Sequence, residues 1–223
     1  MFKGWVIALA CSAILFFVLY YVFSSLNYKR RFKEQYDLRN HFPYEFNYEG
    51  RFSDNILGNI CLLFSSAFSL AVFAVATADK YNNGFVIAAL GSGSLLAILA
   101  VVINFVPLKY IKAHILFMVL LFVSAFASPA LIGFAFFRHF QDFKDTISLV
   151  LFIVSVTVAL FLFVLIMNPK LSLNIPMKKA TDEKGNEYYV RPKIIVIAFS
   201  EWMMLYSMLI SELLIVLLLN VIG

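Results

Sequence analysis

The amino-acid sequence predicts an all-α integral membrane protein, a bundle of six transmembrane helices with a small β-like cytoplasmic hairpin. Three observations support this fold class. Of the 223 residues, 62% are hydrophobic and only 14% are charged, whereas charged residues make up about a quarter of an ordinary soluble domain. Six apolar stretches reach the roughly 20 residues that a helix needs to cross the hydrocarbon core. The Lys and Arg residues gather between these stretches, not within them.

The stretches define one polytopic membrane domain over residues 1–223. The first begins like a signal peptide, but its apolar part is too long for one and runs into a basic cluster, so we expect it to be retained. The middle four are uninterrupted by charge, and the last is longer than a membrane crossing requires. The predicted helices cover residues 5–26, 56–78, 85–106, 115–137, 147–167 and 194–222.

The basic residues predict how the helices are oriented. Fourteen of the 18 Lys and Arg residues fall in three connections, residues 27–55, 107–114 and 168–193. Because positive charge is retained in the cytoplasm, these become cytoplasmic loops and both chain ends lie outside. The chain has no Asn-x-Ser/Thr sequon, which is compatible with the plasma membrane of a bacterium.

The cytoplasmic loops carry further patterns. Residues 42–48 alternate between aromatic and other side chains, which is typical of a strand. A turn sequence at Lys184–Asn186, with β-prone residues after it, predicts a hairpin. Residues 42–48 either join this hairpin as a third strand or form a separate interfacial loop. Basic residues beside the helices are expected to contact anionic headgroups or a partner. These residues are Lys29, Arg30, Arg31, Lys33, Lys178 and Lys179.

Two glutamates in the last apolar stretch, Glu201 and Glu212, are the strongest functional signal. An ionisable group at membrane depth costs about 2.5 to 3.5 kcal/mol on insertion scales, so it normally has a partner or a function. The two are eleven residues apart, which places them on one helix face about 16 Å apart. Ser207 and Ser211 lie alongside, and Asn104 is another polar residue at depth.

The two carboxyls differ in their expected depth. Glu201 lies near the cytoplasmic interface, where we expect it to reach water or to meet a cation such as Lys193 or Arg191. Glu212 lies near the bilayer centre, with no Lys or Arg inside any predicted helix. It is therefore either a neutral carboxyl hydrogen-bonded between helices or a proton or cation site.

Several other classes of site find no support in the sequence. Cys11 and Cys61 both lie in apolar stretches, without a disulfide or metal-ligand pattern. His41, His114 and His139 fall in different predicted loops, so we expect no metal site. No nucleophile, cofactor or zinc-protease motif is present, and we expect no cofactor. The basic residues follow topology, so we expect no nucleic-acid partner.

These observations favour a transporter-type protein, or a membrane subunit of a transport complex, with a proton- or cation-accessible carboxyl in the last helix. The alternative is an interaction protein, for example a regulatory, assembly or toxin-neutralising partner, that uses interhelical contacts and the cytoplasmic loops. A membrane-embedded enzyme is the third possibility. Expected partners are the bilayer, its anionic headgroups, and other membrane subunits or further copies of the chain.

The predicted orientation can be tested by labelling single cysteines in intact cells. We expect an impermeant thiol reagent to label a cysteine placed at Lys80, in the predicted outer loop, because that loop faces the medium. A cysteine at Lys184 should react only after the membrane is permeabilised. The opposite labelling pattern would invert the orientation.

Overall fold

A computed structural model describes residues 3–48, 50–78, 84–172, 177–181 and 187–222 of the chain. It contains six helices that are long and apolar enough to cross a membrane, as hydropathy predicted, which suggests a membrane-embedded, multi-pass protein. The helices are α1 (Lys3–Phe32), α2 (Ile56–Ala78), α3 (Gly84–Val102), α4 (Ile111–Phe143), α5 (Thr146–Ile166) and α6 (Val196–Ile222).

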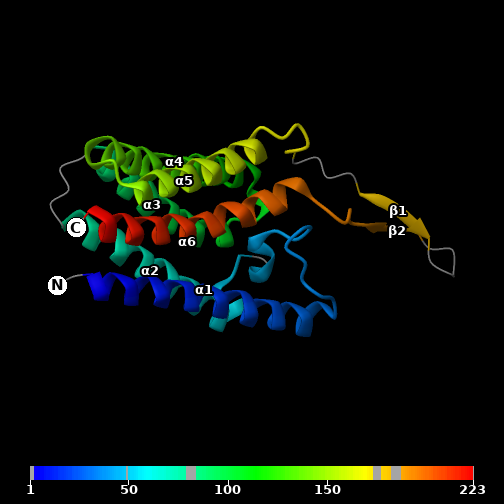
Figure 1. Ribbon diagram of the computed structural model, residues 1–223. Helices are drawn as coiled ribbons and strands as arrows, with labels where there is room; N and C mark the ends of the chain where they lie inside the picture. The colour runs from blue at the N-terminus through cyan, green and yellow to red at the C-terminus, as the bar shows by residue number, and fades with distance from the viewer. Residues whose placement is uncertain (1–2, 49, 79–83, 173–176, 182–186, 223) are drawn as a thin grey trace.

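The helices lie side by side along one long axis, with α6 at the centre (Figure 1). On one side of α6 lie α1 and α2, on the other α3, α4 and α5, and α6 contacts all five. The buried share of the apolar stretch is 67% in α6 but 22% in α5, which lies at the edge. The beginning of α1 and the end of α6 lie at the same end of the bundle.

Two helices are longer than predicted, and the loops next to them are shorter. Helix α1 continues six residues beyond the predicted boundary at residue 26, and its last turn holds three basic residues that favour a helix C-terminus. Helix α4 begins at Ile111 and ends at Phe143, instead of covering 115–137. Its start follows a 3₁₀ turn over Leu108–Tyr110, so His114 is helical and is not a loop residue.

The predicted strand over residues 42–48 is wrong. Pro43–Asn47 form a 3₁₀ helix, in which the amide of Glu45 donates to the carbonyl of Phe42 at 3.0 Å. Phe42 and Phe46 are both buried. The aromatic alternation therefore reflects side chains four residues apart that enter the core, and not the pleat of a strand.

Two short strands follow α5, β1 (Lys178–Thr181) and β2 (Glu187–Val190). They pair antiparallel, with Lys178 opposite Val190 and Thr181 opposite Glu187. The predicted turn at Lys184–Asn186 lies outside the described residues. The pair extends away from the helices at the end opposite the chain termini (Figure 1).

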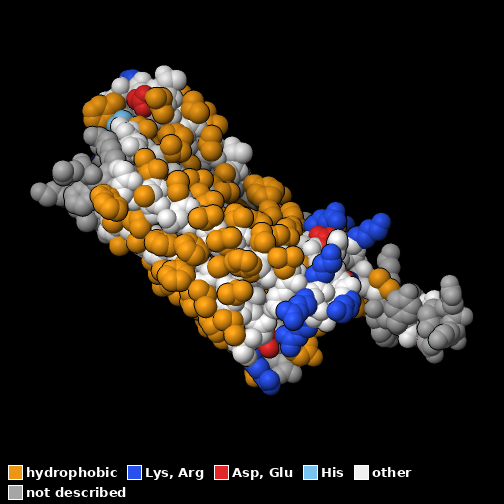
Figure 2. All heavy atoms as spheres, turned by 90° about the horizontal axis from the view of Figure 1, so that it is seen from below, with side chains coloured by type: hydrophobic (Ala, Val, Ile, Leu, Met, Phe, Trp, Pro, Cys, Tyr) orange, Lys and Arg blue, Asp and Glu red, His pale blue; other side chains and the backbone are white. Residues whose placement is uncertain are grey.

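The surface separates apolar and basic regions. Figure 2 shows hydrophobic side chains along most of the visible length of the bundle, with Lys and Arg side chains gathered at the end that carries the strands. We call this the basic end. It contains the C-terminal turn of α1 with Lys29, Arg30 and Arg31, and Lys109 in the turn before α4.

Helix α1 lies close to α2 at Gly58, where there is no room for a side chain. A Cβ atom at Gly58 would clash with Ser24 Oγ and lie 2.5 Å from Asn55 Nδ2. These two side chains are themselves hydrogen-bonded across the helices at 2.7 Å. At Gly91 of α3, in contrast, a Cβ would meet no atom within 4 Å.

Matched glycine substitutions test this packing. Ala favours a helix over Gly by up to about 1 kcal/mol at either position. We expect Gly91→Ala to be neutral or stabilising, whereas Gly58→Ala should lower the free energy of unfolding because overpacking costs about 1–3 kcal/mol. Thermal unfolding in one detergent would measure both. Equal melting temperatures for the two variants would contradict the close approach of α1 and α2.

Candidate functional site

The structure pairs Glu201 with His114, two residues that are both fully buried. Glu201 lies in the second turn of α6, and His114 in the first turn of α4. The Nε2 atom of His114 is 3.0 Å from Oε1 of Glu201. The prediction that Glu201 reaches the interface or meets Lys193 or Arg191 is therefore wrong, because a histidine from a neighbouring helix reaches it inside the bundle.

Hydrogen-bond geometry determines how many protons this pair shares. His114 Nδ1 lies 2.6 Å from the carbonyl oxygen of Val106. A carbonyl only accepts, so Nδ1 carries a hydrogen. The contact between Nε2 and Oε1 then needs one more proton, held either by an imidazolium next to a carboxylate or by a carboxylic acid next to a neutral imidazole. Either state has zero net charge, as a buried site favours.

Aromatic rings and unpaired oxygens surround the pair. The ring of Tyr44 lies 5.5 Å and that of Phe42 lies 6.4 Å from the His114 ring, both nearly edge-on. Within the described part of the chain, Oε2 of Glu201 and the hydroxyl of Ser200 are buried without a hydrogen-bond partner. The pair therefore retains an unused acceptor at its α6 side.

Arg191, one of the cations expected near Glu201, pairs instead with Glu45. Its Nη1 atom lies 2.8 and 2.9 Å from the two carboxylate oxygens of Glu45. Partial burial opposes the charged guanidinium, but the Glu45 carboxylate outweighs it and raises the pKa of Arg191. This ion pair joins the segment before α6 to the 3₁₀ helix of residues 43–47.

Next to the pair, Trp202 ties α6 to the segment after α1. Its indole Nε1 donates to Tyr36 Oη at 3.1 Å and to the carbonyl of His41 at 3.0 Å. The Tyr36 hydroxyl donates in turn to the carbonyl of Phe42 at 2.8 Å. Burial raises the pKa of Tyr36 well above its ordinary value, so this hydroxyl keeps the proton that it donates.

Glu212 lies deeper along α6 and accepts a hydrogen bond from a serine of α2. Ser69 of α2 donates to its Oε2 at 2.9 Å, while Oε1 has no partner among the described residues. Both side chains are fully buried. The contact joins α6 to α2, and the protonation state of Glu212 stays a prediction.

The other predicted polar residues do not join one site with the glutamates. Ser207 donates to the carbonyl of Met204 in its own helix at 2.6 Å. The Ser211 hydroxyl is buried with no partner in the described structure. Asn104 belongs to a separate network at the basic end, where it accepts from the Tyr20 hydroxyl and its carbonyl accepts from Asn47 at 2.9 Å.

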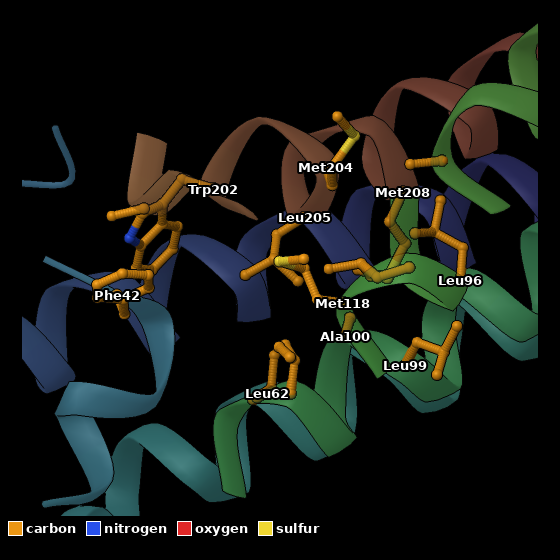
Figure 3. Packing of buried hydrophobic residues seen from close by; sticks show 14 of the residues in the cluster. Phe42, Leu62, Leu96, Leu99, Ala100, Met118, Trp202, Met204, Leu205 and Met208 are labelled. Carbon is orange, nitrogen blue, oxygen red and sulfur yellow. The ribbon is translucent and has the colours of Figure 1, made fainter. Parts of the chain in front are cut away.

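An apolar layer separates the two glutamates. Met204, Leu205 and Met208 of α6 are fully buried, and Figure 3 shows Leu205 and Met208 on the side of α6 that faces Met118 of α4 and Leu96 of α3. These three side chains lie between the Glu201–His114 pair and the Glu212–Ser69 contact along α6.

The predicted headgroup residues are spread over the basic end. Arg31 forms an ion pair with Asp54 at 3.4 Å, and Lys179 on β1 forms one with Glu187 on β2 at 2.9 Å. Lys29 and Arg30 belong to the exposed last turn of α1, and Lys33 follows it with a positive φ of 60°. Lys178 begins β1. These positions do not form one compact patch.

His139 takes part in a cap at the opposite end of α4. Its Nδ1 lies 2.9 Å from the hydroxyl of Ser148, which donates to the carboxylate of Asp145 at 2.9 Å. Because the serine proton goes to Asp145, His139 donates to this hydroxyl and does not act as its base. The described residues contain no group of three or more His, Cys, Asp or Glu side chains that could hold a metal ion.

Comparisons with protein-family models, with curated proteins and with solved structures find no match to this chain. Its candidate site is therefore defined by its own geometry, the buried Glu201–His114 pair and the Glu212–Ser69 contact.

Substitutions at Glu201 test the pair. Glu201→Leu leaves Nε2 of His114 buried without a partner, which costs about 1–3 kcal/mol of unfolding free energy. Glu201→Gln should cost less, because its amide can donate to a neutral imidazole. Thermal unfolding in detergent measures both, with Ser207→Ala as a control whose hydrogen bond stays within one helix turn. Equal effects of Leu and Gln would contradict the His114 contact.

Proposed function

We propose that this chain is a transport-type membrane protein in which α6 carries carboxyls that exchange protons with one side of the membrane. The observation that supports it is the Glu201–His114 pair, fully buried, with its two reacting atoms 3.0 Å apart. The proposal moves the main role from Glu212, the more prominent residue in the sequence, to Glu201.

The energetic argument favours a function for the pair. Burying two ionisable groups costs several kcal/mol for each ion, and well-packed apolar side chains in their place are often equally stable or more stable. Apolar residues would satisfy the packing of α4 against α6 without this cost. An ionisable pair buried between α4 and α6 is therefore better explained by proton binding than by stability.

The location of the pair favours exchange from the basic end. His114 is in the first turn of α4, and its Nδ1 is held by the carbonyl of Val106 in the turn between α3 and α4. In the proposed orientation this end faces the cytoplasm of a bacterial cell. Glu212 would be the second carboxyl on the path, beyond the apolar layer of Met204, Leu205 and Met208.

Infrared spectroscopy of the reconstituted protein tests proton exchange directly. We expect a pH titration in liposomes to change the carboxylic acid C=O absorption, because a group that exchanges protons changes state with the medium. Glu201→Gln should remove one component of this change and Glu212→Gln a second. Ser207→Ala, in the same helix, should leave the change intact.

A spectrum without any pH-dependent carboxyl band that depends on Glu201 would overturn the proposal. This includes a band that depends only on Glu212, because the proposal gives the main role to Glu201. The Gln variants keep the size and hydrogen-bonding capacity of the side chain, and thermal unfolding identifies a variant that has failed to fold.

The second candidate is an interaction protein, and one observation favours it. The paired strands β1 and β2 extend beyond the basic end, away from the helices (Figure 1). Such a projection can add to a partner through backbone hydrogen bonds. The carboxyls do not support a partner helix as the sequence suggested, because Glu201 and Glu212 bind His114 and Ser69 of the same chain. Carboxyls that never titrate would favour this candidate.

A further inference from the structure

A groove of about 510 Å³ lies between the C-terminal half of α1 and the segment that follows this helix. The chain turns back after α1, so that the ring of Tyr36 lies 6.4 Å from that of Tyr21. The groove is lined by Tyr21 and by the eight consecutive residues 34–41. Its volume is many times the roughly 30 Å³ that one water molecule occupies.

His41 contributes an unused hydrogen-bond donor to this groove. The backbone amide of Asp37 donates to its Nδ1 atom at 3.2 Å. The Asp37 carbonyl, 3.0 Å from the same nitrogen, already accepts from the amides of Asn40 and His41. Nδ1 is therefore an acceptor, and Nε2 carries the hydrogen. Only 2% of His41 is exposed, and in the described structure its Nε2 atom is buried without a hydrogen-bond partner.

The imidazole of His41 is held in one orientation. Its ring centroid lies 4.9 Å from that of Tyr36 and 5.3 Å from that of Tyr28. The indole of Trp202 fixes the backbone of the same residue, because it donates to the carbonyl of His41 at 3.0 Å. The free N–H is therefore placed before a ligand arrives, which reduces the entropy lost on binding. A buried donor of this kind is normally satisfied, and a bound molecule would satisfy it.

Glu34 gives the groove its net charge. Asp37 and Arg39 line the groove as well, but they form an ion pair with each other through three contacts of 2.7 to 3.1 Å. Oε1 of Glu34 lies 3.9 Å from Nε2 of His41, which is beyond hydrogen-bond distance. Among the described lining side chains, a carboxylate without a direct hydrogen bond therefore stands next to an N–H donor.

We propose that this groove binds a compact zwitterion, namely a primary ammonium group with a phosphate oxygen a few atoms away, as in ethanolamine phosphate. The ammonium group donates to Glu34, and the phosphate oxygen accepts from Nε2 of His41. A metal ion fits less well, because Nε2 carries a hydrogen and has no free lone pair. The site does not depend on proton exchange by the Glu201–His114 pair.

Two sources could supply this group, a phosphatidylethanolamine molecule of the bilayer and a soluble ethanolamine phosphate ester. The groove begins beside Tyr21 within the apolar stretch of α1 and continues past the end of that helix. Tyr side chains at the ends of membrane helices lie at headgroup depth. The position of the groove is thus within reach of a lipid headgroup and of the aqueous phase.

Native mass spectrometry of the purified full chain tests the site, after release from nanodiscs with equal amounts of phosphatidylethanolamine and phosphatidylcholine. The two headgroups share the phosphate and a net charge of zero, but choline has no N–H to donate to Glu34. We expect the wild-type protein to retain one phosphatidylethanolamine molecule in preference to phosphatidylcholine. Glu34→Gln should weaken this retention about threefold, the effect of one exposed ion pair.

The matched control is Glu187→Gln, which makes the same charge change on β2, outside the groove, at a side chain that is 65% exposed, as Glu34 is. It should retain the lipid as the wild type does. Equal losses for Glu34→Gln and Glu187→Gln would overturn the proposal.

A second measurement separates the two sources. Glycerophosphoethanolamine, with glycerophosphocholine as its control, is added to the protein in detergent. Binding of the ethanolamine compound alone would assign the site to a soluble ligand, whereas retention of phosphatidylethanolamine without such binding would assign it to the lipid. If ethanolamine and choline compounds bind equally both as lipids and as soluble esters, the proposal is overturned.

Discussion

The hydrogen bond between Glu201 and His114 determines how the centre of this bundle is assembled. Helix α6 contacts all five other helices, so a buried carboxyl on it depends on the neighbouring helices for its partner. Glu201 can be buried only if the first turn of α4 is placed beside the second turn of α6, since His114 is its one partner there among the described residues. The carbonyl of Val106 accepts a hydrogen bond from Nδ1, the other ring nitrogen of His114. This bond also fixes the turn between α3 and α4.

The segment between α1 and α2 closes the basic end around this pair. The indole of Trp202 donates a hydrogen bond to the backbone carbonyl of His41 in this segment. Within the segment, the ring of Phe46 stacks on that of Tyr36, with ring centroids 4.0 Å apart. A chain of side-chain amides continues this closure, because Asn59 donates to Asn47, which in turn donates to the carbonyl of Asn104. These bonds use the polar groups of a loop that would otherwise be buried unsatisfied. Phe42, Phe46 and Asn47 of this loop are thus part of the core.

Hydropathy was sufficient to predict the six helices, since length and apolar content decide whether a segment can cross a membrane. It could not locate the start of α4, because Lys112 and His114 lower the hydropathy of a turn that is nonetheless helical. The partner of Glu201 was missed for the same reason. Pro107 was the one signal for an earlier helix start, because proline often stands at the beginning of a helix. The 3₁₀ helix at Pro43–Asn47 was missed because aromatic residues spaced by two suit a strand and a tight turn alike.

Oxidation of the methionines between the two glutamates would report whether water enters this part of the bundle. Met204 and Met208 are completely enclosed, and Met118 is nearly so. Oxidants that act from water convert exposed thioethers to sulfoxides, which are polar and poorly suited to an apolar layer. As long as this layer stays closed, these three sulfur atoms remain reduced while Met167, exposed at the end of α5, is oxidised. Sulfoxide at Met204 or Met208 would therefore mark a conformation in which water has passed between the two carboxyls.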